Sequence, residues 1–227
     1  MDASDARAQI ESDLAWRLDE IRYLRNELIG NHDKQTWPVA AMRSILVMQY
    51  AHLEGFARNA FSVYVDAVNS CNLNSREVHP NLFASALVPE FEAVRAGVSS
   101  DSEGEHARLT RRARTQVEFI AKVRQLEKEP CLIEVESAVS MEMNFGSDVF
   151  RRTLFRLGIP EAEVSRAYYS SLEFVRKMRN DIAHGSRRER IAPGEFEAHQ
   201  QQCERFMGDL AQLISRAIVD EWFRAET

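Results

Sequence analysis

Residues that break helices are scarce in this chain, and their scarcity limits the folds open to it. Only nine glycines and six prolines occur among its 227 residues. Long segments therefore lack the residues that punctuate turn-rich β folds. Apolar residues recur at spacings of three and four, as in a helix with one apolar face. In the first such segment they are Leu14, Leu18, Ile21, Leu24 and Leu28. The pattern predicts an all-α fold.

The same periodicity places the expected helices along the chain. We expect helices at about 4–28, 37–68, 81–97 (interrupted near Pro89), 107–128, 147–157, 161–184 and 194–223, and a short strand at 132–135. No internal repeat and no long linker divides the chain, which predicts a single domain over residues 1–227.

Composition and charge exclude several classes of protein. No apolar run approaches the roughly 20 residues of a membrane-spanning helix, and the acidic N-terminus lacks the features of a secretory signal. The three cysteines, Cys71, Cys131 and Cys203, are too scattered for a disulfide framework or a metal site. We therefore expect a cytoplasmic protein without a membrane segment. The net charge of −6 argues against a broad nucleic-acid surface, but it allows a small basic site.

The end of the expected 161–184 helix is the most informative stretch. At 100° per residue, Tyr168, Leu172, Val175, Met178 and Ile182 fall on one apolar face. Asn180 and His184 lie together on the polar side, Arg179 lies at the margin, and Gly185 suits the left-handed position after a helix end. A histidine here also has a purely structural use, since its cation interacts favourably with the last carbonyl groups.

Two strings of sequence resemble a known family. Residues 179–185, Arg-Asn-Asp-Ile-Ala-His-Gly, resemble the R-x4–6-H motif of HEPN domains, and residues 49–56, Gln-Tyr-Ala-His-Leu-Glu-Gly-Phe, resemble the first core helix of the MAE branch of that family. The resemblance spans about residues 37–223. It implies a HEPN-like bundle of four to five core helices, with residues 1–36 as an accessory N-terminal helix. The small, acidic and glycine-containing composition of residues 98–106 predicts a mobile loop there, as a mid-chain insertion.

The resemblance also implies a ribonuclease that uses no metal and no cofactor. Arg179 and His184 carry over as the catalytic pair, and Asn180 as the polar residue that follows the motif arginine. In the family, two protomers usually join their motifs across a homodimer, and the 2′-hydroxyl of the RNA attacks the neighbouring phosphate. Histidine can exchange protons near neutral pH, and arginine presents a charged fork to phosphate oxygens. One histidine per chain cannot easily act as both acid and base. A dimer would supply a second histidine for the second role.

Further residues are expected to support this site. We expect Asp181 and Glu54 to position it, and we expect an RNA backbone to bind the cations that flank the motif, namely Arg176, Lys177, Arg187, Arg188 and Arg190. A solvated helix end would explain these cations equally well. HEPN toxins that are regulated by nucleotidyltransferase antitoxins often carry a tyrosine where this chain has Ser186, so the identity of an antitoxin or defence-system partner stays open.

Two functions remain compatible with the sequence. The first is an endoribonuclease that acts as a toxin or a phage-defence effector. The second is a non-catalytic HEPN module that binds a partner protein or a nucleotide and keeps Arg179 and His184 for folding.

Overall fold

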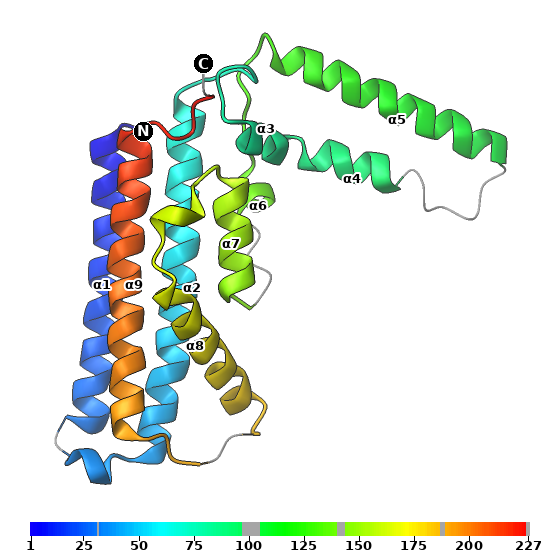
Figure 1. Ribbon diagram of the computed structural model, residues 1–227. Helices are drawn as coiled ribbons and strands as arrows, with labels where there is room; N and C mark the ends of the chain where they lie inside the picture. The colour runs from blue at the N-terminus through cyan, green and yellow to red at the C-terminus, as the bar shows by residue number, and fades with distance from the viewer. Residues whose placement is uncertain (31, 97–104, 140–143, 187–188, 226–227) are drawn as a thin grey trace.

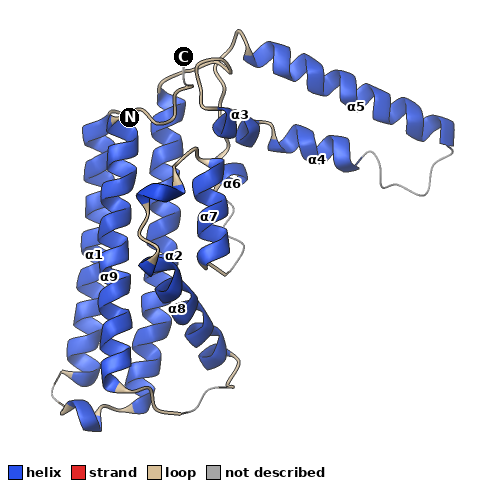
Figure 2. Cartoon of the chain, in the orientation of Figure 1, coloured by secondary structure: helices blue, strands red, loops and turns tan. Residues whose placement is uncertain are grey.

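The computed structural model is helical throughout the part of the chain that it describes, residues 1–30, 32–96, 105–139, 144–186 and 189–225 (Figure 1). Figure 2 shows helices joined by loops. The described residues contain no strand, only an isolated β-bridge between Val78 and Arg224. The α-helices are α1 (Ala3–Ile29), α2 (Val39–Ser70), α3 (Pro80–Ala86), α4 (Val88–Ala96), α5 (Glu105–Leu126), α6 (Val135–Ala138), α7 (Ser147–Arg156), α8 (Ala167–Ala183) and α9 (Pro193–Val219). Short 3₁₀ turns, η1 (Lys34–Thr36) and η2 (Glu161–Glu163), precede α2 and α8. The prediction of an all-α, HEPN-like bundle is confirmed.

Three long helices, α1, α2 and α9, run side by side and form the body of the bundle (Figure 1). Helix α2 is central, because it packs against α1, α8 and α9. Its side chains are buried along most of its length, among them Phe56, Phe61 and Tyr64. A helix that is apolar nearly all round has to be surrounded by others. Helix α1 buries Ala6, Ile10, Ile21 and Ile29 against this body.

The two ends of the bundle carry different elements. Helix α8 lies obliquely against α2 and α9 near the end where the 189–192 segment joins α9 (Figure 1). Near the other end, α3 leads into α4, and α4 packs against α5 to form a hairpin that extends away from the body (Figure 1). The candidate site and this hairpin therefore lie on different parts of the molecule.

The predicted strand at 132–135 is wrong. Its backbone has no strand to pair with, since Ile133 exchanges two hydrogen bonds with the Asn69 side chain of α2, at 2.9 Å each. The Cys131 N–H donates to the Leu73 carbonyl at 2.7 Å, and Val135 already begins α6. Backbone groups in this segment are satisfied by a helix side chain and a loop, which an apolar run in the sequence does not reveal.

Two predicted boundaries also shift. The helix expected from residue 161 begins at Ala167, because Val164 is extended (φ −108°, ψ 130°) and ends the η2 turn. The predicted end of the 98–106 loop is wrong, because Glu105 and His106 already belong to α5. The rest of that loop, residues 98–104, lies outside the described residues.

Candidate functional site

Helix α8 presents the apolar face that its periodicity predicts. Tyr168, Leu172, Val175 and Met178 are buried, and Ile182 is half-buried against the cluster that contains Met42 and Phe196. Side chains at these spacings line one side of a helix, so packing against α2 and α9 fixes the rotation of α8 about its axis. The polar side of its last turn consequently faces away from the core.

The helix ends at the predicted place. The His184 N–H donates to the Asn180 carbonyl at 2.9 Å, and Gly185 adopts the left-handed conformation (φ +72°) that only glycine takes at low cost. His184 occupies the C-cap position and its side chain is exposed. The imidazole is therefore accessible from solvent.

Arg179 is held by two neighbours, and a third residue holds one of these. Its guanidinium lies 5.2 Å from the centre of the Tyr50 ring, within the range of a cation–π interaction. Its Nη1 also donates to Asn180 Oδ1 at 3.0 Å, and Asn180 Nδ2 in turn donates to Asn144 Oδ1 at 3.3 Å. Helices α2 and α8 and the segment before α7 thus fix the direction of the Arg179 side chain. Among the described residues, the His184 side chain makes no hydrogen bond to this group.

Tyr50 and Asn144 are the members of this group that the sequence interpretation missed. The signal for Tyr50 was present, because it lies in the 49–56 string that carried part of the family resemblance. Burial first, and then the negative charge of Glu54, raise the pKa of Tyr50 to about 12. The phenol is therefore neutral at physiological pH. Nothing in the sequence singled out Asn144.

Glu54 and Asp181, expected as positioning residues, lie beside the site in different ways. Glu54 is half-buried and acts electrostatically on Tyr50, and within the described residues it makes no ion pair with Arg179. Asp181 is half-buried in the last turn of α8, and its backbone carbonyl accepts a hydrogen bond of 3.4 Å from the Ser186 hydroxyl.

The flanking cations differ in their freedom to bind a polyanion. Arg176 forms an ion pair with Glu173 at 2.6 Å, and Arg190 donates to the Lys34 carbonyl at 3.1 Å. Lys177 is exposed, and the described structure gives it no ion pair. Arg187 and Arg188 lie outside the described residues. Among the flanking cations that the structure describes, Lys177 is the one most free to meet a phosphate.

Glu173 links α8 to the start of α7. Its Oε1 accepts hydrogen bonds from the Ser147 backbone N–H and hydroxyl, at 2.8 Å each. Gly146 is the N-cap residue of α7 and has no side chain that could accept these hydrogen bonds, so Glu173 caps the helix instead. A Cβ at Gly146 would lie 2.7 Å from both Glu173 Oε1 and Arg176 Cδ. Burial acts to raise the pKa of Glu173, but the hydrogen bonds from Arg176 and Ser147 outweigh it and leave the pKa below its ordinary value.

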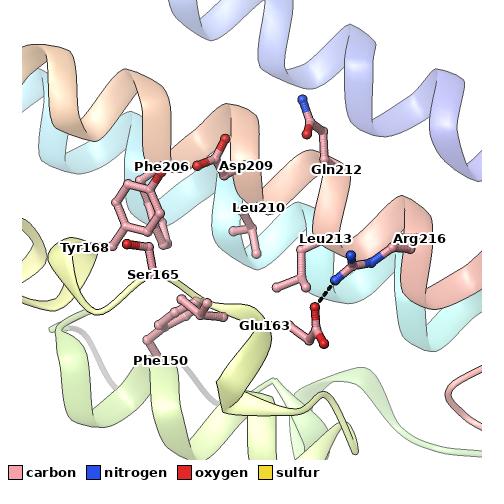
Figure 3. A pocket seen from close by; sticks show the side chains of 11 residues that line it. Phe150, Glu163, Ser165, Tyr168, Phe206, Asp209, Leu210, Gln212, Leu213 and Arg216 are labelled. Atoms are coloured by element: carbon pink, nitrogen blue, oxygen red, sulfur yellow. Dashed lines mark hydrogen bonds and ion pairs between the residues drawn. The ribbon is translucent and has the colours of Figure 1, made fainter.

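A cavity of about 400 Å³ lies at the other end of α8 (Figure 3). In its wall the Tyr168 hydroxyl donates to Asp209, and Arg216 forms an ion pair with Glu163 across η2 and α9. Between Tyr168 and His184 the helix rises by about 24 Å. The cavity is therefore separate from the Arg179 group, and its lining residues take no part in it.

Two features are absent from the described residues. None of their helices has the length and apolarity needed to cross a lipid bilayer. Nor do three or more His, Cys, Asp or Glu side chains gather there in a group suited to a metal ion.

Comparison with known proteins places the chain in a family. A family model described as RiboL-PSP-HEPN matches residues 12–216, which include most of α1 and the whole of α2 and α8. The match does not confirm the MAE branch. No curated protein and no solved structure matches the chain. Since the matched range covers nearly the whole sequence, the chain belongs to the RiboL-PSP-HEPN family of HEPN domains.

Proposed function

We propose that the chain is a metal-independent endoribonuclease that acts as a toxin or a phage-defence effector. The observation that carries the proposal is the last turn of α8. There a fixed guanidinium, Arg179, and an exposed imidazole, His184, lie five residues apart on a helix whose rotation the core determines. Membership of a family that includes ribonucleases supports the assignment.

The reaction needs only acid–base chemistry and charge stabilisation. One imidazole accepts the proton of the 2′-hydroxyl, and the 2′-oxygen attacks the adjacent phosphorus. The bond from phosphorus to the 5′-oxygen breaks, and that oxygen takes a proton from a second imidazole. The products are a 2′,3′-cyclic phosphate and a 5′-hydroxyl. Arg179 stabilises the charge that develops on the phosphate oxygens, and Lys177 holds the neighbouring backbone.

The proposal requires two copies of the chain. Each chain contributes one exposed histidine of the motif, His184, whereas the reaction uses a base and an acid at once. A homodimer that brings two α8 ends together supplies both imidazoles. The RNA would then lie across the dimer, in contact with Lys177 of each protomer.

One observation favours a second function. Arg179 is half-buried, lies on the Tyr50 ring and donates to Asn180, which is also how an arginine with a purely structural role would be held. A non-catalytic module that binds a partner protein or a nucleotide would keep these contacts. It would not require an exposed histidine in the same turn.

An RNA cleavage assay in EDTA tests the proposal. We expect cleavage by the parent protein, and loss of at least about 100-fold in both His184→Ala and Arg179→Ala, in the range that general acid–base groups contribute. His32→Ala and Arg58→Ala, which change exposed residues outside the site, should cleave like the parent. Cleavage that survives either site substitution, or that stops in EDTA, would contradict the proposal.

The position of attack has its own test. An oligonucleotide with a single 2′-deoxy nucleotide at the cleaved position should resist the enzyme there, because the attacking hydroxyl is missing. The all-RNA substrate should yield a cyclic phosphate end, identified by mass. Cleavage at the 2′-deoxy position would exclude this mechanism.

A further inference from the structure

The hairpin of α4 and α5, called here the arm, exposes one complete side of α5. Phe91 of α4 packs against Phe119 of α5 with ring centres 5.3 Å apart, and Thr115 and Val123 are half-buried on that side. The arm extends away from the helical body (Figure 1). The opposite side of α5 consequently faces solvent.

Large aliphatic side chains lie on that solvent side and along its edge. Leu109, Val117 and Ile120 are 54%, 69% and 49% exposed. At 100° per residue they fall within about 80° of one another on the helix. A single exposed apolar residue is ordinary, but three that line one side of a projecting helix mark an interaction surface.

The same helix is basic in a protein of net charge −6. Arg124 lies on the aliphatic side, and Arg112 and Arg114 flank it. In the described structure none of these three arginines makes an ion pair. Helix α5 contains only two acidic residues, Glu105 and Glu118. Its cations are Arg108, Arg111, Arg112, Arg114, Lys122 and Arg124. The surface therefore suits an occupant that is acidic and apolar.

The outer face of α1 has this complementary character. Trp16 and Tyr23 are 48% and 63% exposed. Glu20 and Glu27 fall within about 60° of them around the helix. Trp16 contacts Arg17, which lies 4.6 Å from its ring centre, and packs edge-on against His52 at 5.4 Å. Its Nε1 donates to Asp13 at 2.9 Å, and the exposed part of the indole lies outside these contacts. Large aromatic side chains next to carboxylates are a favourable partner for aliphatic side chains next to arginines.

The arm and α1 cannot meet within one chain. They lie on opposite sides of the body, with α2 and α9 between them (Figure 1). RNA would match the charge of the arm, but single-stranded nucleic acids are held by stacking on aromatic rings, and the exposed side of α5 carries aliphatic ones. A second copy of the chain matches both the charge and the apolar character.

We propose that the basic, aliphatic side of α5 binds the acidic, aromatic face of α1 in a second copy of this chain. The contact joins two different surfaces, so it closes into a ring of copies or continues as a chain. It neither requires nor replaces a contact between α8 ends, and RNA cleavage does not depend on it.

The first test measures the mean mass of the purified protein by light scattering over a range of concentrations. Val117→Glu and Ile120→Glu each place a carboxylate in the aliphatic surface, and we expect a lower mean mass and at least about 10-fold weaker association. Ser44→Glu adds the same group at an exposed position of α2, outside both surfaces, and should associate like the parent. A milder change, Val117→Ser, should act in the same direction if a glutamate disturbs the arm. Circular dichroism checks that each variant keeps the helix content of the parent.

The second test mixes two defective proteins. Tyr23→Glu damages the α1 face and leaves the arm intact, whereas Val117→Glu does the reverse. Each variant alone should have a low mean mass. The mixture should have a higher mean mass than either, because the intact arm of one variant binds the intact α1 face of the other. A parent that never associates, arm variants that associate like the parent, or a mixture with no gain in mass would overturn the proposal. None of these results would affect a cleavage site formed by α8.

Discussion

The Arg179 guanidinium lies 5.2 Å from the centre of the Tyr50 ring, so the two sequence strings that resemble the HEPN family meet in space. Tyr50 belongs to residues 49–56 of α2, and Arg179 opens the 179–185 string of α8. The ring supports the cation while Asn180 accepts one of its hydrogen bonds. Helix α2 therefore helps to aim the residue that is proposed to bind the phosphate.

This contact predicts different effects for two changes at Tyr50. Tyr50→Leu removes the ring and should lower kcat/KM for RNA cleavage about 5- to 30-fold, which corresponds to a cation–π contribution of about 1–2 kcal/mol. Tyr50→Phe keeps the ring and should stay within about 3-fold of the parent. Equal losses in the two variants would show that the hydroxyl, and not the ring, matters.

The periodicity of the sequence predicted most helices within a few residues. It also predicted the buried face of α8, because burial on one side of a helix leaves a regular spacing of apolar residues. The prediction of a strand at 132–135 was wrong for a physical reason. A short apolar run has no property that distinguishes a strand from an extended segment, and only the position of Asn69 decides where its backbone bonds.

The site was predictable only in part. Arg179, Asn180 and His184 lie within six consecutive residues, and the spacing of four places Asn180 and His184 on one side of the helix. Tyr50 and Asn144 reach Arg179 and Asn180 from segments more than 30 residues away, which is a property of the packed fold. The pairing of Arg176 with Glu173 could not be inferred from their spacing alone, since exposed pairs at this spacing often stay open.

Glu173 should contribute to stability through the cap it provides to α7. Glu173→Ala removes the acceptor for both Ser147 groups and should lower the free energy of unfolding by about 1 kcal/mol, a typical value for a lost cap. Urea unfolding measures the change. Glu118→Ala, at an exposed helix position, is the matched control and should change stability by less than about 0.5 kcal/mol. Equal effects would mean that the cap contributes nothing.

The three cysteines should differ in reactivity. Cys71 is exposed, whereas burial raises the pKa of Cys131 to about 11 and that of Cys203 to about 12. Thiolates are the reactive form, so a thiol reagent at about pH 8 should modify one cysteine quickly in the native protein and all three in denaturant. Cys71→Ser should abolish the fast native reaction. A fast reaction that persists in that variant would show that a buried thiol becomes accessible.

His199 should make the stability of the protein depend on pH. Its ring stacks on Phe174 with ring centres 3.5 Å apart, and burial lowers its pKa below the ordinary 6.5, although Glu195 acts in the opposite direction. The unfolded chain therefore binds a proton more readily than the folded protein does. Stability from this residue is complete above about pH 6.5 and is lost as the pH falls through the lowered pKa.

Replacing this imidazole should flatten the pH profile. His199→Phe keeps a ring against Phe174 and removes the titrating group, so its free energy of unfolding should fall less than that of the parent between about pH 7 and pH 5. His199→Gln should show the same flattening at a lower overall stability, because it loses the stacked ring. Burial also lowers the pKa of His52, so part of the pH dependence of stability remains in both variants. Urea midpoints across this range measure the difference, and profiles parallel to that of the parent would rule out a contribution from His199.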